Sequence, residues 1–138
     1  MPFLTQSAAG LRGALQVYGN DYPTRDGTAI RDYIHVVDLA AAHAVALERM
    51  LTASMVEPME VFNLGTGEGS TVLEVIQSFE RATGLPLSWS FAPRRDGDVV
   101  AAYADTRRAT EVLGWTAQKS LDEAMADAWR WQQALASS

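Results

Sequence analysis

The fold depends on residues 30–40, which read Ile30-Arg31-Asp32-Tyr33-Ile34-His35-Val36-Val37-Asp38-Leu39-Ala40. Residues 30–36 predict a short strand, because β-branched and aromatic side chains dominate them. In residues 37–51 the apolar side chains recur at helical spacing, and Asp38 lies in the first turn, where the helix dipole favours negative charge. This stretch therefore predicts a strand that leads directly into an amphipathic helix.

Further helices and strands are expected on both sides of this stretch. We expect helices at residues 2–13, 71–83, 106–113 and from 120 onward, and strands at 15–18, 60–64 and 87–92. Thr71 and Glu74 form a capping-box pattern that begins one helix, and Ser120 and Glu123 begin another. In the last helix we expect an inward face of Leu121, Ala124, Ala128, Trp131 and Leu135. The order predicts an α/β fold with a small mixed sheet and several helices.

Composition restricts the functional classes. The 138 residues fit one domain, and the net charge of −6 argues against binding nucleic acid. The absence of cysteine excludes disulfides, thiol catalysis and cysteine-based zinc sites. The longest apolar run, near residues 40–47, is too short to span a bilayer. A cytoplasmic protein without a membrane partner is the expectation.

A glycine-rich segment, Gly65-Thr66-Gly67-Glu68-Gly69-Ser70, suggests a dinucleotide-binding turn. Its third glycine comes one position early for the Gly-x-Gly-x-x-Gly pattern, because Ser70 occupies that position. No acidic residue ends the next predicted strand, where a ribose partner is expected. We interpret the segment as a tight turn into a helix capped by Ser70 or Thr71, with the approach of a phosphate to that helix start left open.

A longer block resembles the UDP-glucose 4-epimerases of the extended short-chain dehydrogenase/reductase superfamily. It reads Tyr18-Gly19-Asn20-Asp21-Tyr22-Pro23-Thr24-Arg25-Asp26-Gly27-Thr28 and continues through residues 30–40. The resemblance extends to Phe62-Asn63-Leu64-Gly65, Ala92-Pro93-Arg94-Arg95-Asp96-Gly97-Asp98 and Trp129-Arg130-Trp131-Gln132. It implies that residues 1–138 are the UDP-sugar-binding C-terminal region of a Rossmann-type enzyme whose N-terminal nucleotide-binding half is absent.

The resemblance implies a binding role for four residues. Arg31 and Arg95 would hold the UDP diphosphate, which suits planar and permanently charged guanidinium groups. Tyr18 would lie against the uracil, and Asp98 would accept hydrogen bonds from the ribose hydroxyls. From the residues alone, ion pairs with Asp32 or Asp98 are the preferred role of the two arginines, and a half-buried core position is the preferred role of Tyr18.

A fifth position concerns the sugar. Ala102 corresponds to a position where some members of the family carry a bulky residue that limits the space near the sugar C2 substituent. A small side chain there suggests that N-acetylated UDP-hexosamines are accepted as well. A shift of one position in the correspondence would place Tyr103 there instead.

The catalytic parts of the family are not found in the sequence. The epimerases use NAD, a Tyr-x-x-x-Lys pair and an N-terminal glycine fingerprint. Here Tyr103 is followed four places later by Arg107, and Lys119 is preceded four places earlier by Trp115. We therefore expect no catalytic and no cofactor-binding residue in this chain, and no epimerase activity from the chain alone.

Other functions stay open at this stage. The chain would also suit a non-catalytic UDP-sugar-binding or interaction module, or part of another nucleotide-sugar dehydratase or decarboxylase. His35 and His43 lack a third metal ligand at recognisable spacing, so we expect no metal site. The family is often homodimeric, and the predicted strand at 60–64 would expose an unpaired edge, so self-association is expected.

Overall fold

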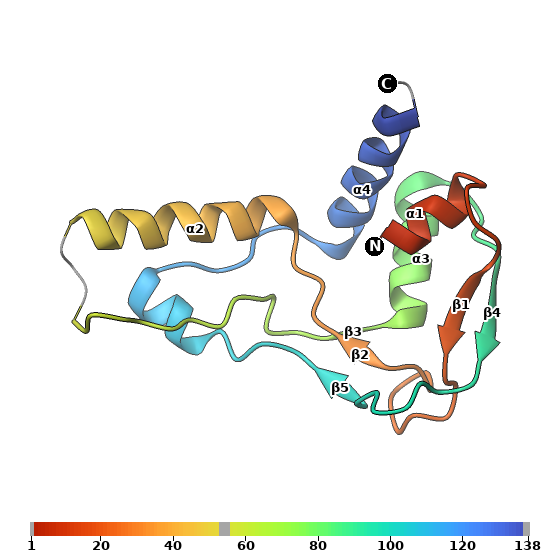
Figure 1. Cartoon of the computed structure of the whole chain (residues 1–138), viewed down its shortest axis with the longest axis horizontal. Helices are drawn as coiled ribbons and strands as arrows, with labels where there is room; N and C mark the ends of the chain where they lie inside the picture. The colour runs from red at the N-terminus through yellow and green to blue at the C-terminus, as the bar shows by residue number, and fades with distance from the viewer. Residues whose placement is uncertain (1, 53–55, 137–138) are drawn as a thin grey trace.

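The computed structural model describes residues 2–52 and 56–136, and it has the predicted α/β architecture (Figure 1). Helices and strands follow one another along the chain, and the two small sheets lie in the right-hand half of the view (Figure 1). The α-helices are α1 (Pro2–Ala8), α2 (Val36–Leu51), α3 (Val72–Thr83) and α4 (Leu121–Ala136), and one π-helical turn, η1, covers Ala109–Leu113.

Two small sheets hold the chain together. Strand β1 (Leu15–Tyr18) pairs in parallel with β4 (Trp89–Ala92). In the second sheet, β2 (Ile30–Arg31) lies between β3 (Ser70–Thr71), which is antiparallel to it, and β5 (Ala101–Ala102), which is parallel. The predicted mixed sheet is thus confirmed, and it joins segments far apart in the sequence.

The larger hydrophobic core lies among α1, β1, α3, β4 and α4, which together we call the compact lobe. Phe79 of α3 is completely buried, and its ring meets that of Trp129 edge-on at a centroid distance of 5.9 Å. An edge-to-face pair is a favourable arrangement of two aromatic rings. The buried members of this core are Leu4, Val17, Val75, Ile76, Phe79, Leu87, Ala124 and Met125.

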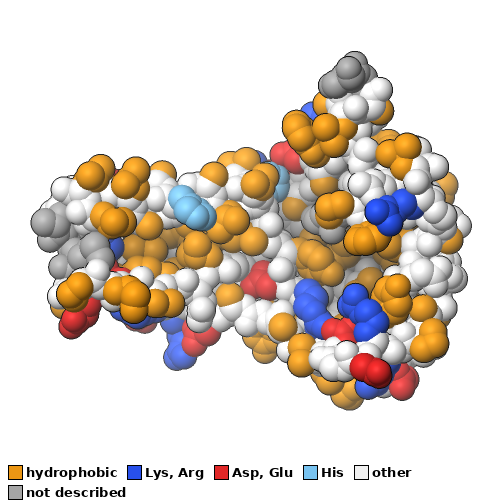
Figure 2. All heavy atoms as spheres, viewed as in Figure 1, with side chains coloured by type: hydrophobic (Ala, Val, Ile, Leu, Met, Phe, Trp, Pro, Cys, Tyr) orange, Lys and Arg blue, Asp and Glu red, His pale blue; other side chains and the backbone are white. Residues whose placement is uncertain are grey.

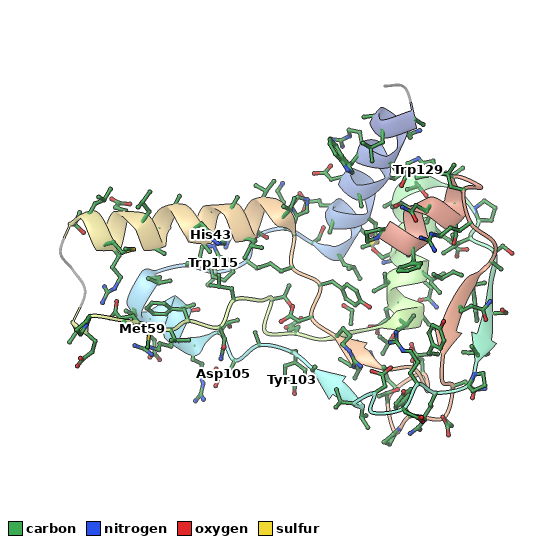
Figure 3. All side chains as sticks on the ribbon, in the orientation of Figure 1. His43, Met59, Tyr103, Asp105, Trp115 and Trp129 are labelled. Carbon is green, nitrogen blue, oxygen red and sulfur yellow. The ribbon has the colours of Figure 1, made fainter. Side chains whose placement is uncertain are left out.

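The second part of the molecule, which we call the arm, consists of α2, residues 56–69 and residues 104–119 (Figures 1 and 3). Its buried core contains Ala42, Ala109 and Trp115. The indole Nε1 of Trp115 donates to the Asp38 carbonyl oxygen at 3.2 Å, and the Asp38 carboxylate accepts from the backbone of residues 118 and 119. Asp38 therefore connects the start of α2 to the segment that leads into α4.

Helix boundaries follow the predicted caps. Thr71 and Glu74 form the capping box of α3, which ends at Gly84 in a left-handed conformation with φ 71°. Ser120 and Glu123 exchange the corresponding hydrogen bonds at the start of α4. His35 caps α2, because its Nδ1 accepts from the Val37 N–H at 3.0 Å. The capping-box patterns were therefore sufficient to place the starts of α3 and α4, whereas the His35 cap of α2 was not predicted.

The expected strand at residues 60–64 is wrong, because these residues form no ladder with any described strand. A strand needs the hydrogen-bonding groups of a neighbour, and this segment is instead held within the arm by contacts with α2 and with Arg108. Glu60 forms an ion pair with Arg49 at 2.7 Å, and the Val61 carbonyl accepts from Arg108 at 3.0 Å.

Other predicted elements prove shorter. Helix α1 ends at Ala8 instead of residue 13, because Gly10 adopts a left-handed conformation with φ 71°. The strand expected at 30–36 is restricted to Ile30–Arg31, and the one expected at 87–92 begins at Trp89. The helix expected at 106–113 is present from residue 107 onward, and its last five residues, Ala109–Leu113, have the π-helical conformation of η1.

The predicted inward face of α4 is correct only in its first half. Ala124 is buried and Leu121 packs against the core, whereas Trp131 is 66% exposed and Leu135 is 52% exposed; the buried Met125 was not among the predicted residues. The core under α4 consists of α1 and α3, and the end of the helix extends past both of them (Figure 1).

Candidate functional site

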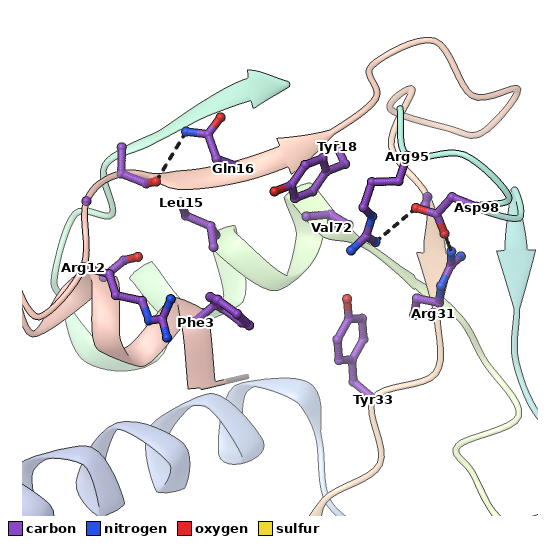
Figure 4. A pocket seen from close by; sticks show the side chains of 14 residues that line it. Phe3, Arg12, Leu15, Gln16, Tyr18, Arg31, Tyr33, Val72, Arg95 and Asp98 are labelled. Carbon is purple, nitrogen blue, oxygen red and sulfur yellow. Dashed lines mark hydrogen bonds and ion pairs between the residues drawn. The ribbon is translucent and has the colours of Figure 1, made fainter. Parts of the chain in front are cut away.

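A cavity of about 540 Å³ opens at the edge of the compact lobe, where it is lined by residues of α1, β1, β2 and the loop between β4 and β5 (Figure 4). Four of the five predicted substrate-binding residues line it, namely Tyr18, Arg31, Arg95 and Asp98. They come from three separate segments, and the sheets bring them together. Tyr18 ends β1, Arg31 ends β2, and the other two lie in the loop between β4 and β5. Cavities of this volume suit small-molecule ligands.

The register of the sheets explains this convergence. Tyr18 pairs with Ala92, so the loop that carries Arg95 starts beside Tyr18. Ile30 pairs with Ala101, so the same loop ends beside Ile30, the residue before Arg31. Strands β1 and β2 thus hold the two ends of the loop, and residues 93–100 cross from one to the other over the cavity.

The two arginines share one carboxylate. Arg31 donates to Oδ1 of Asp98, and Arg95 donates to Oδ2 at 3.1 Å. The side chain of Asp98 is 13% exposed, that of Arg31 is 27% exposed and that of Arg95 is 62% exposed. Burial opposes ionisation of Asp98, but the hydrogen bond from Arg95 and the charges of both arginines outweigh it and lower its pKa. The cluster carries one net positive charge, and Arg95 is the member most accessible to a ligand.

Tyr18 supplies a flat surface next to this cluster. The guanidinium carbon of Arg95 lies 4.7 Å from the centroid of the Tyr18 ring, which is a cation–π distance. The ring is partly exposed, as a residue that stacks against a base must be. In this arrangement Arg95 occupies a face of the ring, so a stacked base would have to share or displace that contact.

Ala102 lies next to the cavity and does not line it. It pairs with Arg31 across the β2–β5 ladder and is exposed to solvent. Its effect on the sugar C2 substituent stays a prediction.

The cavity residues that the sequence did not indicate include Tyr33, Phe3 and Arg12. Tyr33, which packs against the core of the compact lobe, also lines the cavity two residues after Arg31, and burial raises the pKa of its hydroxyl against the opposing charge of Arg31. The two-residue spacing could have indicated that Arg31 and Tyr33 share a face. Phe3 and Arg12 reach the cavity from α1 and the segment after it. No local pattern distinguishes them.

The glycine-rich turn is occupied by groups of the protein itself. The Asp32 carboxylate accepts from the backbone N–H groups of Thr66 at 2.9 Å and Ala104 at 3.1 Å, and from Gly67 at 3.3 Å. At the start of α3, the Thr71 N–H donates to Glu74, and the Thr71 hydroxyl donates to Asp26. Carboxylates thus occupy the positions that a phosphate would need, which agrees with our interpretation of this segment as a structural turn.

The sequence profile of the family described as GDP-mannose 4,6 dehydratase matches residues 1–128. The chain belongs to this family. Among curated relatives, the UDP-glucose 4-epimerase of Yersinia pestis is 51% identical over 132 residues, which are 96% of this chain and 38% of that protein. The UDP-glucose 4-epimerase of Homo sapiens is 48% identical over 133 residues, or 37% of its length.

Solved structures of UDP-glucose 4-epimerases are also similar to this chain over nearly all of its length. The UDP-glucose-4-epimerase from Stenotrophomonas maltophila, solved with NAD and formylated UDP-arabinopyranose, superimposes with a TM-score of 0.93 at 46% identity over 99% of this chain and 40% of its own. The UDP-Glc/GlcNAc 4-epimerase from Campylobacter jejuni has a TM-score of 0.84 at 34% identity over 95% of this chain and 39% of its own. The chain thus spans about two-fifths of the length of these relatives. Within residues 2–52 and 56–136, none of the helices combines the length and apolarity needed to cross a bilayer.

Proposed function

We propose that residues 1–138 form the UDP-sugar-binding region of a UDP-glucose 4-epimerase, which interconverts UDP-glucose and UDP-galactose as part of a longer protein. One observation carries the proposal: Tyr18, Arg31, Arg95 and Asp98 line a single cavity. The similarity to 4-epimerases at 48–51% identity supports the same conclusion.

The charges of the cavity suit a diphosphate. Arg31 approaches Asp98 from β2 and Arg95 approaches it from the loop between β4 and β5, so they can present donors to a diphosphate from two directions. Each charge-assisted hydrogen bond would contribute about 1.5–3 kcal/mol. Asp98 holds the two guanidinium groups in place before the ligand arrives. Both of its oxygens are engaged, so a ribose hydroxyl would bind Asp98 only by sharing or replacing a contact with an arginine.

The NAD of the proposed reaction does not fit the residues described here. The glycine-rich turn of the chain has its N–H groups bonded to Asp32, and it ends at a helix start already capped by Glu74. We assign NAD binding and the proton and hydride transfers to polypeptide outside these 138 residues. In our proposal this chain binds and orients the UDP-sugar, and Ala102 leaves room for an N-acetylated sugar.

Calorimetry with UDP tests the binding site. We expect the chain to bind UDP, and Arg95→Ala to weaken the affinity at least tenfold, on the order of one lost charge-assisted hydrogen bond. Arg107→Ala removes the same charge from the exposed surface of the arm and is the matched control. Equal affinities of wild type and Arg95→Ala would refute the proposed site.

An activity assay tests the division of roles. The purified chain, incubated with NAD and UDP-galactose, should produce no UDP-glucose above background. Turnover would contradict the assignment of the chemistry to other polypeptide.

A non-catalytic UDP-sugar-binding module is the second candidate. The observation that favours it is that the four residues meet within this chain. Both candidates predict UDP binding, and they differ in whether a longer form has epimerase activity. An assay of a full-length protein that contains this sequence separates them.

We also propose that the isolated chain self-associates through the arm. Leu47, Met50 and Leu51 of α2 are exposed, and so are Val56, Met59 and Val61 of the following segment (Figure 2). Sedimentation of the wild type and of a Leu47→Asp, Leu51→Asp variant tests this, and a monomeric wild type would contradict it. The cytoplasmic location stays a prediction from the sequence.

A further inference from the structure

Arg12 lies at the end of the cavity opposite the arginine–aspartate cluster. Figure 4 shows Arg12 and Phe3 on one side and Arg31, Arg95 and Asp98 on the other, with Leu15, Val72 and Tyr18 between them. The Arg12 guanidinium carbon lies 4.4 Å from the centroid of the Phe3 ring. Its Nε donates to Oε1 of Gln6 at 2.6 Å. The side chain is therefore held from two directions, by a flat ring and by an amide.

The charge of Arg12 is not neutralised. Arg31 and Arg95 both contact Asp98, whereas no carboxylate within residues 2–52 and 56–136 forms an ion pair with Arg12. The bond to Gln6 uses Nε, so the terminal nitrogens keep donors for another acceptor. A cation held on the wall of a cavity, with free donors and no counter-ion among the described residues, is suited to a ligand oxygen.

The shape of a nucleotide determines which atom would reach Arg12. With the diphosphate at Arg31 and Arg95, a nucleoside that followed the cavity past Tyr18 and Val72 would extend towards Arg12, which lines the same cavity. The glycosidic bond of a pyrimidine is at N1, and C4 lies across the ring from N1. The C4 substituent is therefore the part of the base that points away from the ribose and towards Arg12. In uracil this substituent is a carbonyl oxygen, which accepts from a guanidinium. In cytosine this substituent is an amino group, whose N–H donors would face the N–H donors of the Arg12 guanidinium.

We propose that Arg12 is a specificity-determining residue that selects pyrimidine nucleotides with a 4-carbonyl over those with a 4-amino group. This inference rests on the proposed UDP-sugar site and adds to it a means of recognising the base. The role differs from that of Arg31 and Arg95, because it concerns the identity of the base and not the charge of the phosphates.

Calorimetry with UDP and CDP tests the inference, since these ligands share ribose and diphosphate and differ at the base edge. We expect the wild type to bind UDP about tenfold more tightly than CDP, as one charge-assisted hydrogen bond implies. Arg12→Ala should weaken UDP binding about tenfold and leave CDP binding nearly unchanged, so that the ratio of the two affinities approaches one. Arg12→Gln tests the same ratio with a bulkier uncharged side chain, and circular dichroism confirms that each variant is folded.

The matched control is Arg107→Ala, which changes the net charge equally and should leave both affinities unaltered. A parallel fall in UDP and CDP affinity in Arg12→Ala would mean general attraction of anions and would overturn the inference. If Arg95→Ala weakens UDP binding while both Arg12 variants keep the wild-type ratio, the proposed function stands and the role of Arg12 is refuted. If the wild type binds neither nucleotide, the site and the inference fail together.

Discussion

The compact lobe and the arm both contain helices with apolar side chains, but they differ in how much of that apolar surface is buried. In the lobe, α1, α3 and α4 pack against one another and bury a core centred on Phe79 and Met125. In the arm, α2 contributes Ala42 to a small core under Trp115, and most of its larger apolar side chains are exposed. Helices in proteins derive most of their stability from tertiary packing, so α2 should be the less stable of the long helices. The binding cavity belongs to the better packed part of the molecule.

The largest expected effect comes from truncating the lobe core. Phe79→Ala should lower the free energy of unfolding by about 3–5 kcal/mol, because it removes a fully buried ring and its contact with Trp129. Val36→Ala at the start of α2 is the control: that side chain is 71% exposed, and its loss should change stability by at most about 0.5 kcal/mol. Urea denaturation followed by tryptophan fluorescence measures both. Comparable losses would show that the two parts do not differ as described.

Hydrogen exchange compares the two parts without mutation. The backbone amides of α2 should be at least about tenfold less protected than those of α3, because local opening depends on the contacts that each helix makes. Mass spectrometry of peptides from residues 36–51 and 72–83 provides the measurement. Equal protection would mean that the arm and the lobe unfold as one unit.

Within the arm, Trp115 is the residue on which the small core depends. Trp115→Phe should leave the Asp38 carbonyl without its indole partner and destabilise the arm by about 1–3 kcal/mol. We expect the loss of protection in α2 to exceed that in α3, with UDP affinity unchanged. An equal loss in both helices would contradict the independence of the two parts.

The smallest expected effect concerns the cap of α4. Hydrogen bonds from Lys119 and from the Ser120 backbone and hydroxyl lower the pKa of Glu123 to about 2 from 4.5. The folded state binds the proton less readily than the unfolded state, so this contribution is complete above pH 4.5 and disappears as the pH falls towards 2. Glu123→Gln should therefore melt slightly below the wild type at pH 7 and match it near pH 2, as thermal melts would show. A difference that stays constant with pH would exclude this carboxylate as the cause.

Much of the site could be predicted from the sequence because its residues belong to a long block with a clear family resemblance. Tyr18, Arg31, Arg95 and Asp98 all line the cavity where the resemblance implied a ligand. Arg12 and Phe3 carry no such signal, because they become cavity residues only when α1 folds back beside β1. Tyr33 lies between these cases, since its spacing from Arg31 indicated a shared face but not a cavity.

The sequence alone determined the helix starts, the α/β order and the residue types of the site. Caps and turns depend on residues within a few positions of one another, so Thr71–Glu74 and Ser120–Glu123 act as their spacing predicts. Only the tertiary structure decided which segments pair. Residues 60–64 have the composition of a strand and form none in the described structure, because a ladder requires a neighbouring strand. The burial of α2 likewise depends on which segments pack against it, and most of its larger apolar side chains are exposed. Arg12 lines the cavity only because the folded chain places it there.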